Sequence, residues 1–197
     1  MKIINMRSKR ENIVFTMNFI RLIPHLIVFY LHKNKPIIRE DIKNNLMLIN
    51  QSQGDLKGLI YLLSFERAFR NLFYYRVQPF EIILNLICPQ LYTLRIDACT
   101  IGPGLAISHG FATTIGARSI GENCTIFQQV TLGAARQEGY PTILNNVKIY
   151  AGAIIIGNVT IGNNSVIGAN ATVYKDVPDN CTVLPGTSRV MKWKSIE

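Results

Sequence analysis

Residues 143–173 read ILNNVKIYAGAIIIGNVTIGNNSVIGANATV, and an aliphatic residue recurs at every sixth position of this stretch. The recurring residues are Ile143, Ile149, Ile155, Ile161, Ile167 and Val173. A period of six matches neither the turn of an α-helix, about 3.6 residues, nor the two-residue alternation of a strand. It is typical of a β-solenoid, in which short strands alternate with turns and three such sides close each coil.

The same repeat extends towards the N-terminus. It passes back through Leu132, Ile126 and Ile120 and, after one extra residue, through Ile107 and Ile101. A small or apolar residue follows four places after most of the aliphatic ones: Cys124, Val130, Val147, Ala153, Val159, Ser165, Ala171 and Val177. We expect both sets to point inward, while the pairs Asn145–Asn146 and Asn163–Asn164 form corners whose backbone angles asparagine tolerates.

The repeat is interrupted once. Residues 133–142 read GAARQEGYPT, which is polar and rich in turn-forming residues. A solenoid can expel such an insert as a loop without disturbing the stacking of its coils, and inserts of this kind often line a binding face. A neutral surface loop is the alternative.

The first 90 or so residues contain no repeat. Residues 41–50 and 56–73 space their apolar side chains by three and four, which predicts helices. In the second stretch Leu59, Leu62, Leu63 and Phe69 share one face, and Glu66, Arg67 and Arg70 lie towards another. Pro36 and residues 52–54 are expected to separate helices.

Residues 15–31, FTMNFIRLIPHLIVFYL, form the first apolar run. Arg21, Pro24 and His25 interrupt it, whereas a membrane-spanning helix needs about 20 predominantly apolar residues. We expect a pair of helices packed on their own domain, with an amphipathic segment lying on a membrane face as the alternative. The run also lacks the small-residue cleavage site of a secretory signal.

The chain has 197 residues and a formal net charge of +9, most of it in the first half. Residues 1–92 contain 13 Lys and Arg against 6 Asp and Glu. These charges are dispersed, which favours solvated helix faces, and no helix-turn-helix or basic helix indicates nucleic-acid binding. The four cysteines form no CxxC pair or Cys/His cluster, so we expect no metal site and reduced, cytosolic thiols.

His109 is the candidate for catalysis among the three histidines. His25 and His32 lie in the apolar N-terminal stretch, where packing is the expected role. His109 comes two places after the inward Ile107, at a position that can face outward, and Gln128 occupies the corresponding place one coil later. We expect these two side chains to share one surface, with His109 as a general base.

Four segments carry a resemblance to a known family: IGPGLAISHG (101–110), SIGENCTIFQQVTLG (119–133), IYAGAIIIGNVTIGNNSVIGANATV (149–173) and DVPDNCTVLPGTSRV (176–190). Together they resemble the hexapeptide-repeat acyltransferases, in particular the branch of serine acetyltransferases and colanic acid acetyltransferases. The resemblance implies an α+β chain in which an N-terminal helical region precedes a left-handed parallel β-helix with one protruding loop. The expected boundaries are 1–92 for the helical region, 93–185 for the β-helix with its loop at 133–142, and 186–197 for a tail.

The family's mechanism would assign roles to several residues. The resemblance implies a homotrimer, or a dimer of trimers, that binds acetyl-CoA in the groove between subunits. His109 would take the proton of an acceptor hydroxyl, which attacks the thioester directly. The turn at Gly133–Ala134 would supply backbone N–H donors to the oxyanion.

The coenzyme would be held by a second group of residues. Ala151, Gly152, Gly168 and Ala169 match positions where the family lets pantetheine approach the backbone. Arg189 and Lys192 would meet the phosphates of acetyl-CoA, and their alternative reading is that of solvated tail charges.

Three departures from the serine acetyltransferase pattern bear on the acceptor. Ser108 stands where those enzymes carry an Asp directly before the histidine, and Gly139–Tyr140 replaces an Arg-His pair that contacts the amino acid. The carboxylate that orients the base falls on Leu94, with Asp97 as a weak substitute. Colanic-type enzymes, in contrast, share the His-Gly pair and the interval from His109 to Ile120.

We therefore expect a cytoplasmic O-acetyltransferase whose acceptor is a sugar hydroxyl of an exopolysaccharide, a capsule or a lipid-linked precursor. Ser108 and Tyr140 would lie at the acceptor. Contact with the inner membrane would suit a lipid-linked precursor. The alternatives are a serine O-acetyltransferase, a non-catalytic β-helix that serves as a scaffold, and an N-acetyltransferase of amino-sugars.

Overall fold

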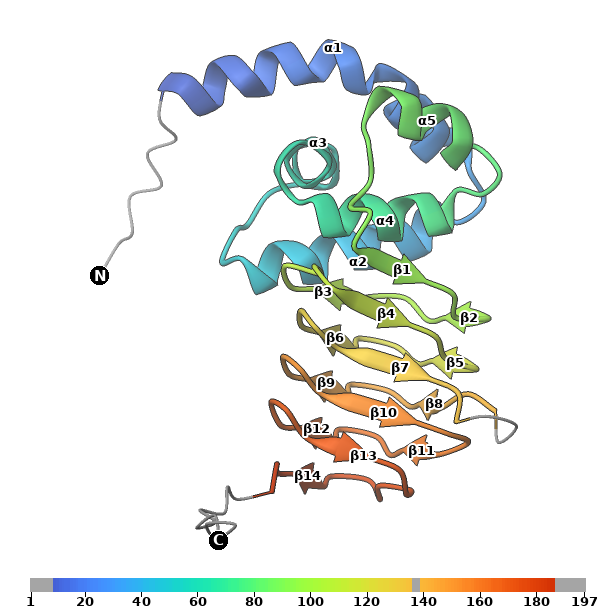
Figure 1. The fold of residues 1–197 in the computed structure, drawn as a ribbon. Coiled ribbons are helices and arrows are strands. Elements are labelled where there is room, and N and C mark those ends of the chain that lie inside the picture. The colour runs from blue at the N-terminus through green and yellow to red at the C-terminus, as the bar shows by residue number, and fades with distance from the viewer. Residues whose placement is uncertain (1–8, 136–138, 187–197) are drawn as a thin grey trace, which may run out of the picture.

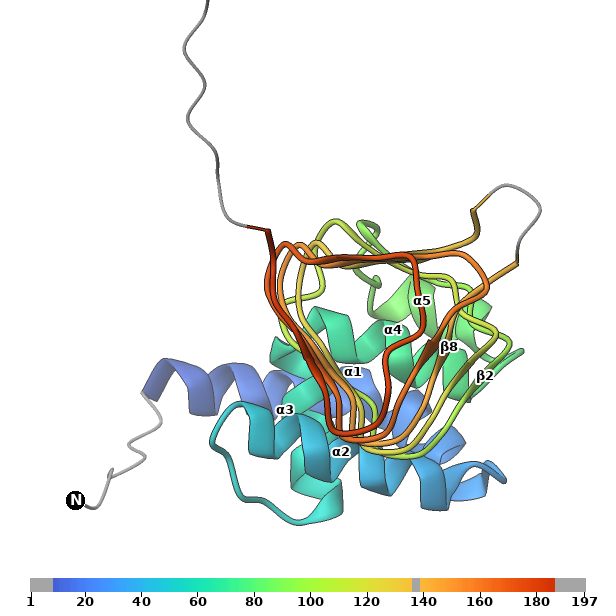
Figure 2. The same cartoon turned by 90° about the horizontal axis from the view of Figure 1, so that it is seen from below.

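The computed structural model describes residues 9–135 and 139–186, with side chains from residue 18 onward. Five helices lie at one end of the molecule, and a stack of short strands extends away from them (Figure 1). Seen along the stack, the coils form a triangular outline with one strand position on each side (Figure 2).

The helices are α1 (Lys9–Leu31), α2 (Lys35–Leu48), α3 (Asp55–Phe65), α4 (Arg67–Arg76) and α5 (Glu81–Ile87). They enclose an apolar core of their own, to which Leu22, Phe29, Leu59 and Phe73 contribute. The predicted inward residues of the second stretch, Leu59, Leu62, Leu63 and Phe69, are at most 1% exposed. Pro36 lies in the first turn of α2, where its missing N–H costs no helical hydrogen bond.

Two expectations for this region are wrong. Residues 15–31 belong to one continuous helix that contains Pro24, rather than to a pair of helices. Proline removes one helical hydrogen bond, but Leu22, Leu26 and Phe29 are buried on both sides of it, and this packing keeps the helix in one piece. No helix in the described part of the chain is long and apolar enough to cross a membrane.

The second wrong expectation concerns residues 56–73, which form two helices rather than one. The backbone of Glu66 is extended, with φ −106° and ψ 91°, so α3 ends at this residue and α4 begins after it. Arg70, expected on a solvated face, is 7% exposed. Its guanidinium donates hydrogen bonds to the carbonyl oxygens of Leu63, Ser64 and Pro89, which offset the cost of burying the charge.

The strands form three parallel sheets, one for each side of the triangle. Sheet A contains β1 (Leu94–Ile96), β4 (Thr113–Ile115), β7 (Thr131–Gly133), β10 (Ile154–Ile156) and β13 (Thr172–Val173). Sheet B contains β2 (Thr100–Ile101), β5 (Ser119–Ile120), β8 (Thr142–Ile143) and β11 (Thr160–Ile161). Sheet C contains β3 (Ala106–Ile107), β6 (Thr125–Ile126), β9 (Lys148–Ile149), β12 (Val166–Ile167) and β14 (Thr182–Val183).

The sequence repeat sets the register of these sheets. Ile101, Ile120, Ile143 and Ile161 pair directly from coil to coil along sheet B. All the aliphatic residues of the repeat are buried, as are the small residues predicted four places after them. The expected left-handed parallel β-helix is thereby confirmed. Ile115, which the six-residue register passes over, is fully buried and fills the sheet A side of the second coil.

An asparagine ladder runs along the corner between sheets B and C. Asn123, Asn146, Asn164 and Asn180 all have φ between 56° and 58°, the left-handed region in which asparagine is one of the few tolerated residues. The side-chain amide of Asn146 donates to Asn164, and that of Asn164 donates to Asn180. Asn44 of α2 donates to Asn123, so the ladder continues into the helical region.

Helix α2 covers the open end of the solenoid, where the first coil has no preceding coil to bond with. The carboxylate of Asp41 accepts hydrogen bonds from the backbone N–H groups of Gly104 and Leu105. Arg76 of α4 pairs with Asp41 at 2.8 Å and donates to the carbonyl oxygen of Gly102. Side chains of the helices therefore supply hydrogen-bond partners to the backbone of the first coil, as a neighbouring coil does in the rest of the solenoid.

Candidate functional site

Most of the predicted site residues lie along one edge of the solenoid, the corner that follows the strands of sheet C. The pairs Ile107–Ile126, Ile126–Ile149 and Ile149–Ile167 fix the register along this edge. Two residues later, His109, Gln128, Ala151 and Ala169 occupy equivalent places on successive coils. We call this edge the histidine corner.

The first coil has a longer histidine corner than the coils below it. His109 has φ 60° and Gly110 has φ 68°, and the N–H of Gly110 bonds back to the carbonyl oxygen of Ser108. A side chain at position 110 would come within 2.8 Å of the Cβ of Ala68 in α4. Glycine therefore lets the corner approach the helices closely, and this contact fixes the backbone beside His109.

A small cavity of about 110 Å³, partly open to solvent, lies beside His109. Its polar side chains are those of Asn45, Glu66, Ser108 and His109, and the rest of its wall is apolar. The amide of Asn45 is already committed, because it donates to Leu105 and accepts from the N–H of Ile107. The groups left free to meet a bound molecule are the imidazole, the hydroxyl of Ser108 and the carboxylate of Glu66.

Glu66 was not predicted as a site residue. Its number is far from that of His109, and the helical pattern of its neighbours placed it on a solvated face. The break between α3 and α4 and the close contact of α4 with Gly110 bring it to the cavity. The local sequence gives no signal for either feature.

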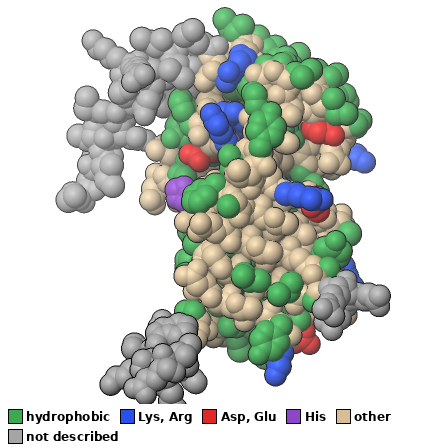
Figure 3. Space-filling model, viewed as in Figure 1, with side chains coloured by type: hydrophobic (Ala, Val, Ile, Leu, Met, Phe, Trp, Pro, Cys, Tyr) green, Lys and Arg blue, Asp and Glu red, His purple; other side chains and the backbone are tan. Residues whose placement is uncertain are grey.

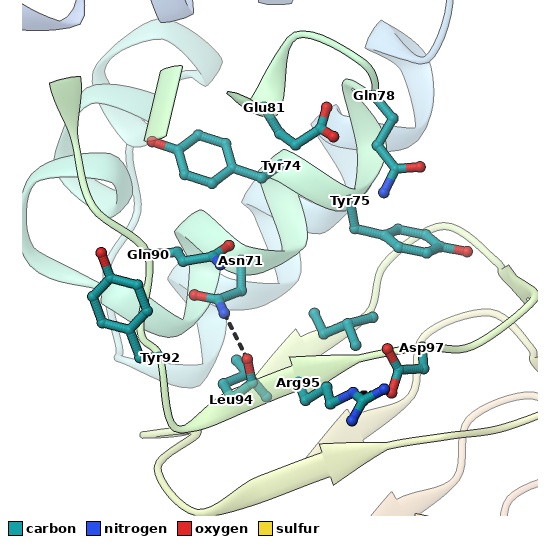
Figure 4. A pocket seen from close by; sticks show the side chains of 11 residues that line it. Asn71, Tyr74, Tyr75, Gln78, Glu81, Gln90, Tyr92, Leu94, Arg95 and Asp97 are labelled. Atoms are coloured by element: carbon teal, nitrogen blue, oxygen red, sulfur yellow. Dashed lines mark hydrogen bonds and ion pairs between the residues drawn. The ribbon is translucent and has the colours of Figure 1, made fainter. Parts of the chain in front are cut away.

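Asp97 does not lie with His109. Its carboxylate pairs with Arg95 at 2.5 Å, and both residues line a different pocket between α4, α5 and β1 (Figure 4). Leu94, at the position where the family carries its orienting carboxylate, is buried in the core. Among the described residues His109 forms no hydrogen bond, so its orienting partner is neither of these two.

Gln128 and the small residues below it form the rest of the histidine corner. The side-chain oxygen of Gln128 is buried and has no hydrogen-bond partner among the described residues, so it can still accept one from a bound molecule. A side chain at Gly152 would collide with Asn170, and one at Gly168 would meet the carbonyl oxygen of Val183. Contact with the next coil is therefore sufficient to explain these two glycines.

Gly133, Ala134 and Tyr140 lie at another corner, the one that follows sheet A and carries the loop. Figure 2 shows this loop leaving from a different corner than the one at which the chain leaves the solenoid after β14. The ring of Tyr140 packs against Gly116, while no described residue would meet a side chain at Gly133. Within one chain, the histidine corner and the predicted site residues at the loop corner therefore lie apart.

The cysteines and the remaining candidates add little to the site. Burial raises the pKa of Cys124 to about 11 and raises that of Cys88, which disfavours the thiolate form a nucleophile needs. The described residues contain no group of three or more potential metal ligands. Arg189 and Lys192, predicted to meet phosphates, lie outside the described residues.

Comparison with known proteins supports both the hexapeptide repeat and the resemblance to serine acetyltransferases. Residues 140–175 match the family described as bacterial transferase hexapeptide (six repeats). The serine acetyltransferase of Synechococcus elongatus is 45% identical over 95 residues, which are 46% of this chain and 39% of that protein. The resemblance inferred from the four segments is confirmed.

Solved structures extend the similarity beyond the repeat. The serine acetyltransferase of Neisseria gonorrhoeae superposes with a TM-score of 0.63 at 25% identity, covering 84% of this chain and 70% of that one. Serine acetyltransferase 1 of Entamoeba histolytica, in complex with L-cysteine, gives 0.59 at 25% identity, covering 88% and 74%. The sequence alignment with the curated relative from Synechococcus, in contrast, spans less than half of that protein's length.

Proposed function

We propose that this chain, a hexapeptide-repeat protein similar to serine acetyltransferases, is an acetyl-CoA-dependent O-acetyltransferase. The observation that carries the proposal is the histidine corner. It presents an exposed imidazole, a free amide oxygen at Gln128 and the small residues Ala151 and Ala169 in line on successive coils. Such a column offers a base at one end and a path for a long, thin thioester below it.

The proposed transfer proceeds in one step without an acyl-enzyme. His109 accepts the proton of the acceptor hydroxyl while the oxygen attacks the thioester carbon. The carbon–sulfur bond breaks, the imidazolium returns the proton to the leaving thiolate, and the products are an acetyl ester and free coenzyme A. The raised pKa values of Cys88 and Cys124 agree with direct transfer, because neither thiol is poised as a nucleophile.

The oxyanion donors would come from a second copy of the chain. Gly133 and Ala134 lie at the loop corner, away from His109, so a complete site needs a neighbouring subunit whose loop corner meets this histidine corner. Such contacts are heterologous and close into a ring, for which we propose the homotrimer. None of the residues that the structure describes would crowd a ligand approaching the backbone of Gly133.

The comparisons favour L-serine as the acceptor over a sugar. The curated relative and both solved structures described above are serine acetyltransferases, and none of them supports the expected exopolysaccharide or capsule. A sugar stays the second candidate because Gly139–Tyr140 replaces the Arg-His pair with which that family contacts an amino acid, and Ser108 replaces the Asp before the histidine.

The test is release of free thiol from acetyl-CoA by the purified chain, with L-serine and a panel of sugars and oligosaccharides as acceptors. We expect turnover with L-serine and its loss by at least about 100-fold in His109→Ala. The matched control is His32→Ala, outside the proposed site. Thiol release that is equal in wild type and His109→Ala, or absent with every acceptor, would overturn the proposal.

A further inference from the structure

Helices α1 and α5 expose a large apolar surface to which the proposed reaction assigns no role. On α1 the large apolar side chains that are 42–82% exposed recur at intervals of three and four residues: Phe19, Ile20, Ile23, Ile27, Tyr30 and Leu31. On α5 and directly before it, those that are 47–83% exposed are Phe80, Ile82, Ile83 and Leu86. Single exposed apolar residues are common on protein surfaces, whereas a group of this size marks an interaction surface. We call it the α1–α5 face.

The two helices of this face lie side by side and run in opposite directions. The ring of His32, directly after α1, meets the ring of Phe80 edge-on, with the ring centroids 6.2 Å apart. At the other end Arg21 lies beside Cys88, directly after α5. Both helices belong to the end of the molecule away from β14 (Figure 1), and Figure 3 shows hydrophobic side chains gathered at this end. The exposed apolar residues of α1 and α5 therefore adjoin one another.

The charges around the α1–α5 face are mainly positive. Among the described side chains of residues 18–35 and 80–88, the cations are Arg21, Lys33 and Lys35, and the acid is the half-buried Glu81. The Nζ of Lys35 lies 4.4 Å from the centroid of the Tyr30 ring, so a cation directly adjoins the apolar residues. An apolar surface bordered by cations complements an anionic lipid bilayer, whose headgroups attract the cations while the apolar side chains leave water.

A second copy of the chain would complement this face less well. A two-fold contact brings the same surface patch of both copies together. Arg21, Lys33 and Lys35 would then share one contact with their equivalents in the partner. Glu81 could offset little of this repulsion, because its Oε2 is already buried within its own chain. Lipid phosphates, in contrast, can neutralise all three cations.

We propose that the α1–α5 face binds the surface of an anionic lipid bilayer, with α1 lying along the membrane rather than crossing it. Its apolar side chains would enter the boundary between headgroups and acyl chains, and Tyr30 suits this depth because its ring is apolar and its hydroxyl polar. The solenoid would project away from the bilayer, since it extends from the other side of the helical region (Figure 1). This binding does not depend on the acetyl transfer proposed above.

The test is cosedimentation of the full chain with phosphatidylcholine vesicles, prepared with or without phosphatidylglycerol. We expect binding to the anionic vesicles that weakens as salt is added, and much weaker binding to the neutral ones. Leu86→Gln should lower the partition coefficient roughly tenfold, because an 83% exposed leucine no longer enters the bilayer. The matched control is Leu184→Gln, which is 75% exposed at the far end of the solenoid and should bind like the wild type.

A charge reversal tests the cationic border separately. Lys33→Glu should lower binding to the anionic vesicles roughly tenfold, whereas Lys175→Glu, an exposed position at the far end of the solenoid, changes the net charge equally and should have little effect. All four positions are exposed, so thermal denaturation should show that the variants fold like the wild type.

Three results would overturn the proposal. They are no binding of the wild type to anionic vesicles, equal binding to neutral and anionic vesicles, and equal binding by Leu86→Gln and the wild type. Sedimentation equilibrium without lipid distinguishes the other occupant of the face. A smaller assembly in Leu86→Gln than in the wild type would assign the face to contact between copies of the chain, and would also overturn the proposal.

Discussion

The solenoid and the helical region satisfy their buried polar groups in different ways. In the solenoid, most backbone hydrogen bonds run from one coil to the next, and the asparagine ladder repeats one side-chain contact along a corner. In the helical region, buried polar side chains such as His25, Asp41 and Arg70 each form contacts that are not repeated elsewhere in the molecule's described part. Repetition spreads stability over many similar contacts, whereas unique contacts concentrate it in a few residues.

The junction between the solenoid and the helical region is held by unique contacts rather than repeated ones. Asp41 and Arg76 are at most 4% exposed, and together they hold four backbone groups of the first coil. A solenoid needs a capping element at each end, and here the cap depends on one buried ion pair. The loss of one partner should therefore be far more costly than the loss of any single corner residue.

The largest effect is expected for Arg76→Leu. The variant leaves the carboxylate of Asp41 buried without a counter-charge, which costs about 3–5 kcal/mol of unfolding free energy. Chemical denaturation of wild type and variant measures the difference.

Arg39→Leu is the matched control for this variant. The ion pair between Arg39 and Asp55 has the same 2.8 Å separation, but its side chains are 51% and 50% exposed, so its loss should cost no more than about 1 kcal/mol. Equal losses in the two variants would mean that the cap does not depend on the buried pair.

The junction also marks where prediction from the sequence fails. The inward residues of the solenoid were predictable because the same contact recurs every six positions and one error in register would misplace all of them. Arg70 and Arg76 both lie in α4, an amphipathic helix, in which arginine normally faces solvent. Both are buried because the chain breaks and turns around them: Arg70 binds the carbonyl oxygens at the end of α3 and of Pro89, and Arg76 binds Asp41 and the first coil. A local pattern contains no information about these partners.

A second, smaller effect concerns the pH dependence of stability. His25 is fully buried, and burial, with the charges of Arg70 and Arg21 adding to it, lowers its pKa to about 4. Its Nε2 lies 3.0 Å from the hydroxyl of Tyr74. Its Nδ1 has no hydrogen-bond partner among the described residues, so nothing there would accept a hydrogen bond from a protonated Nδ1. The folded protein therefore holds this histidine neutral.

The sign of the effect follows from linkage. Unfolded His25 has a pKa near 6.5, so the unfolded state binds an additional proton below that pH, and stability falls as the pH drops towards 4. The shift corresponds to about 3 kcal/mol. Denaturation at several pH values should show that His25→Met loses less stability than wild type over this window. Identical slopes in the two proteins would contradict the assignment.

The site was predictable to the extent that it follows the repeat. The sequence placed His109 and Gln128 on one corner, because both follow an inward residue by two positions. Asp97 was proposed as a weak substitute for the orienting carboxylate because it lies near Leu94, where the family carries that carboxylate, but its pairing with Arg95 directs it to another pocket. Glu66 reaches the cavity beside His109 only through the packing of α4 on Gly110, a contact between regions that have no common repeat.

The smallest effect is expected within the asparagine ladder, where the solenoid's repetition should limit the damage. Asn164→Ala places a residue without a compensating side-chain amide at φ 56° and removes the bonds to Asn146 and Asn180. We expect a loss of about 1–2 kcal/mol in thermal or chemical denaturation. Asn164→Gly, which relieves the backbone strain, should lose less. Asn158→Ala, an exposed asparagine outside the ladder, should change stability by no more than about 0.5 kcal/mol. If Asn164→Ala instead cost as much as Arg76→Leu, repetition would not protect the solenoid, and its corners would be as individually critical as the cap.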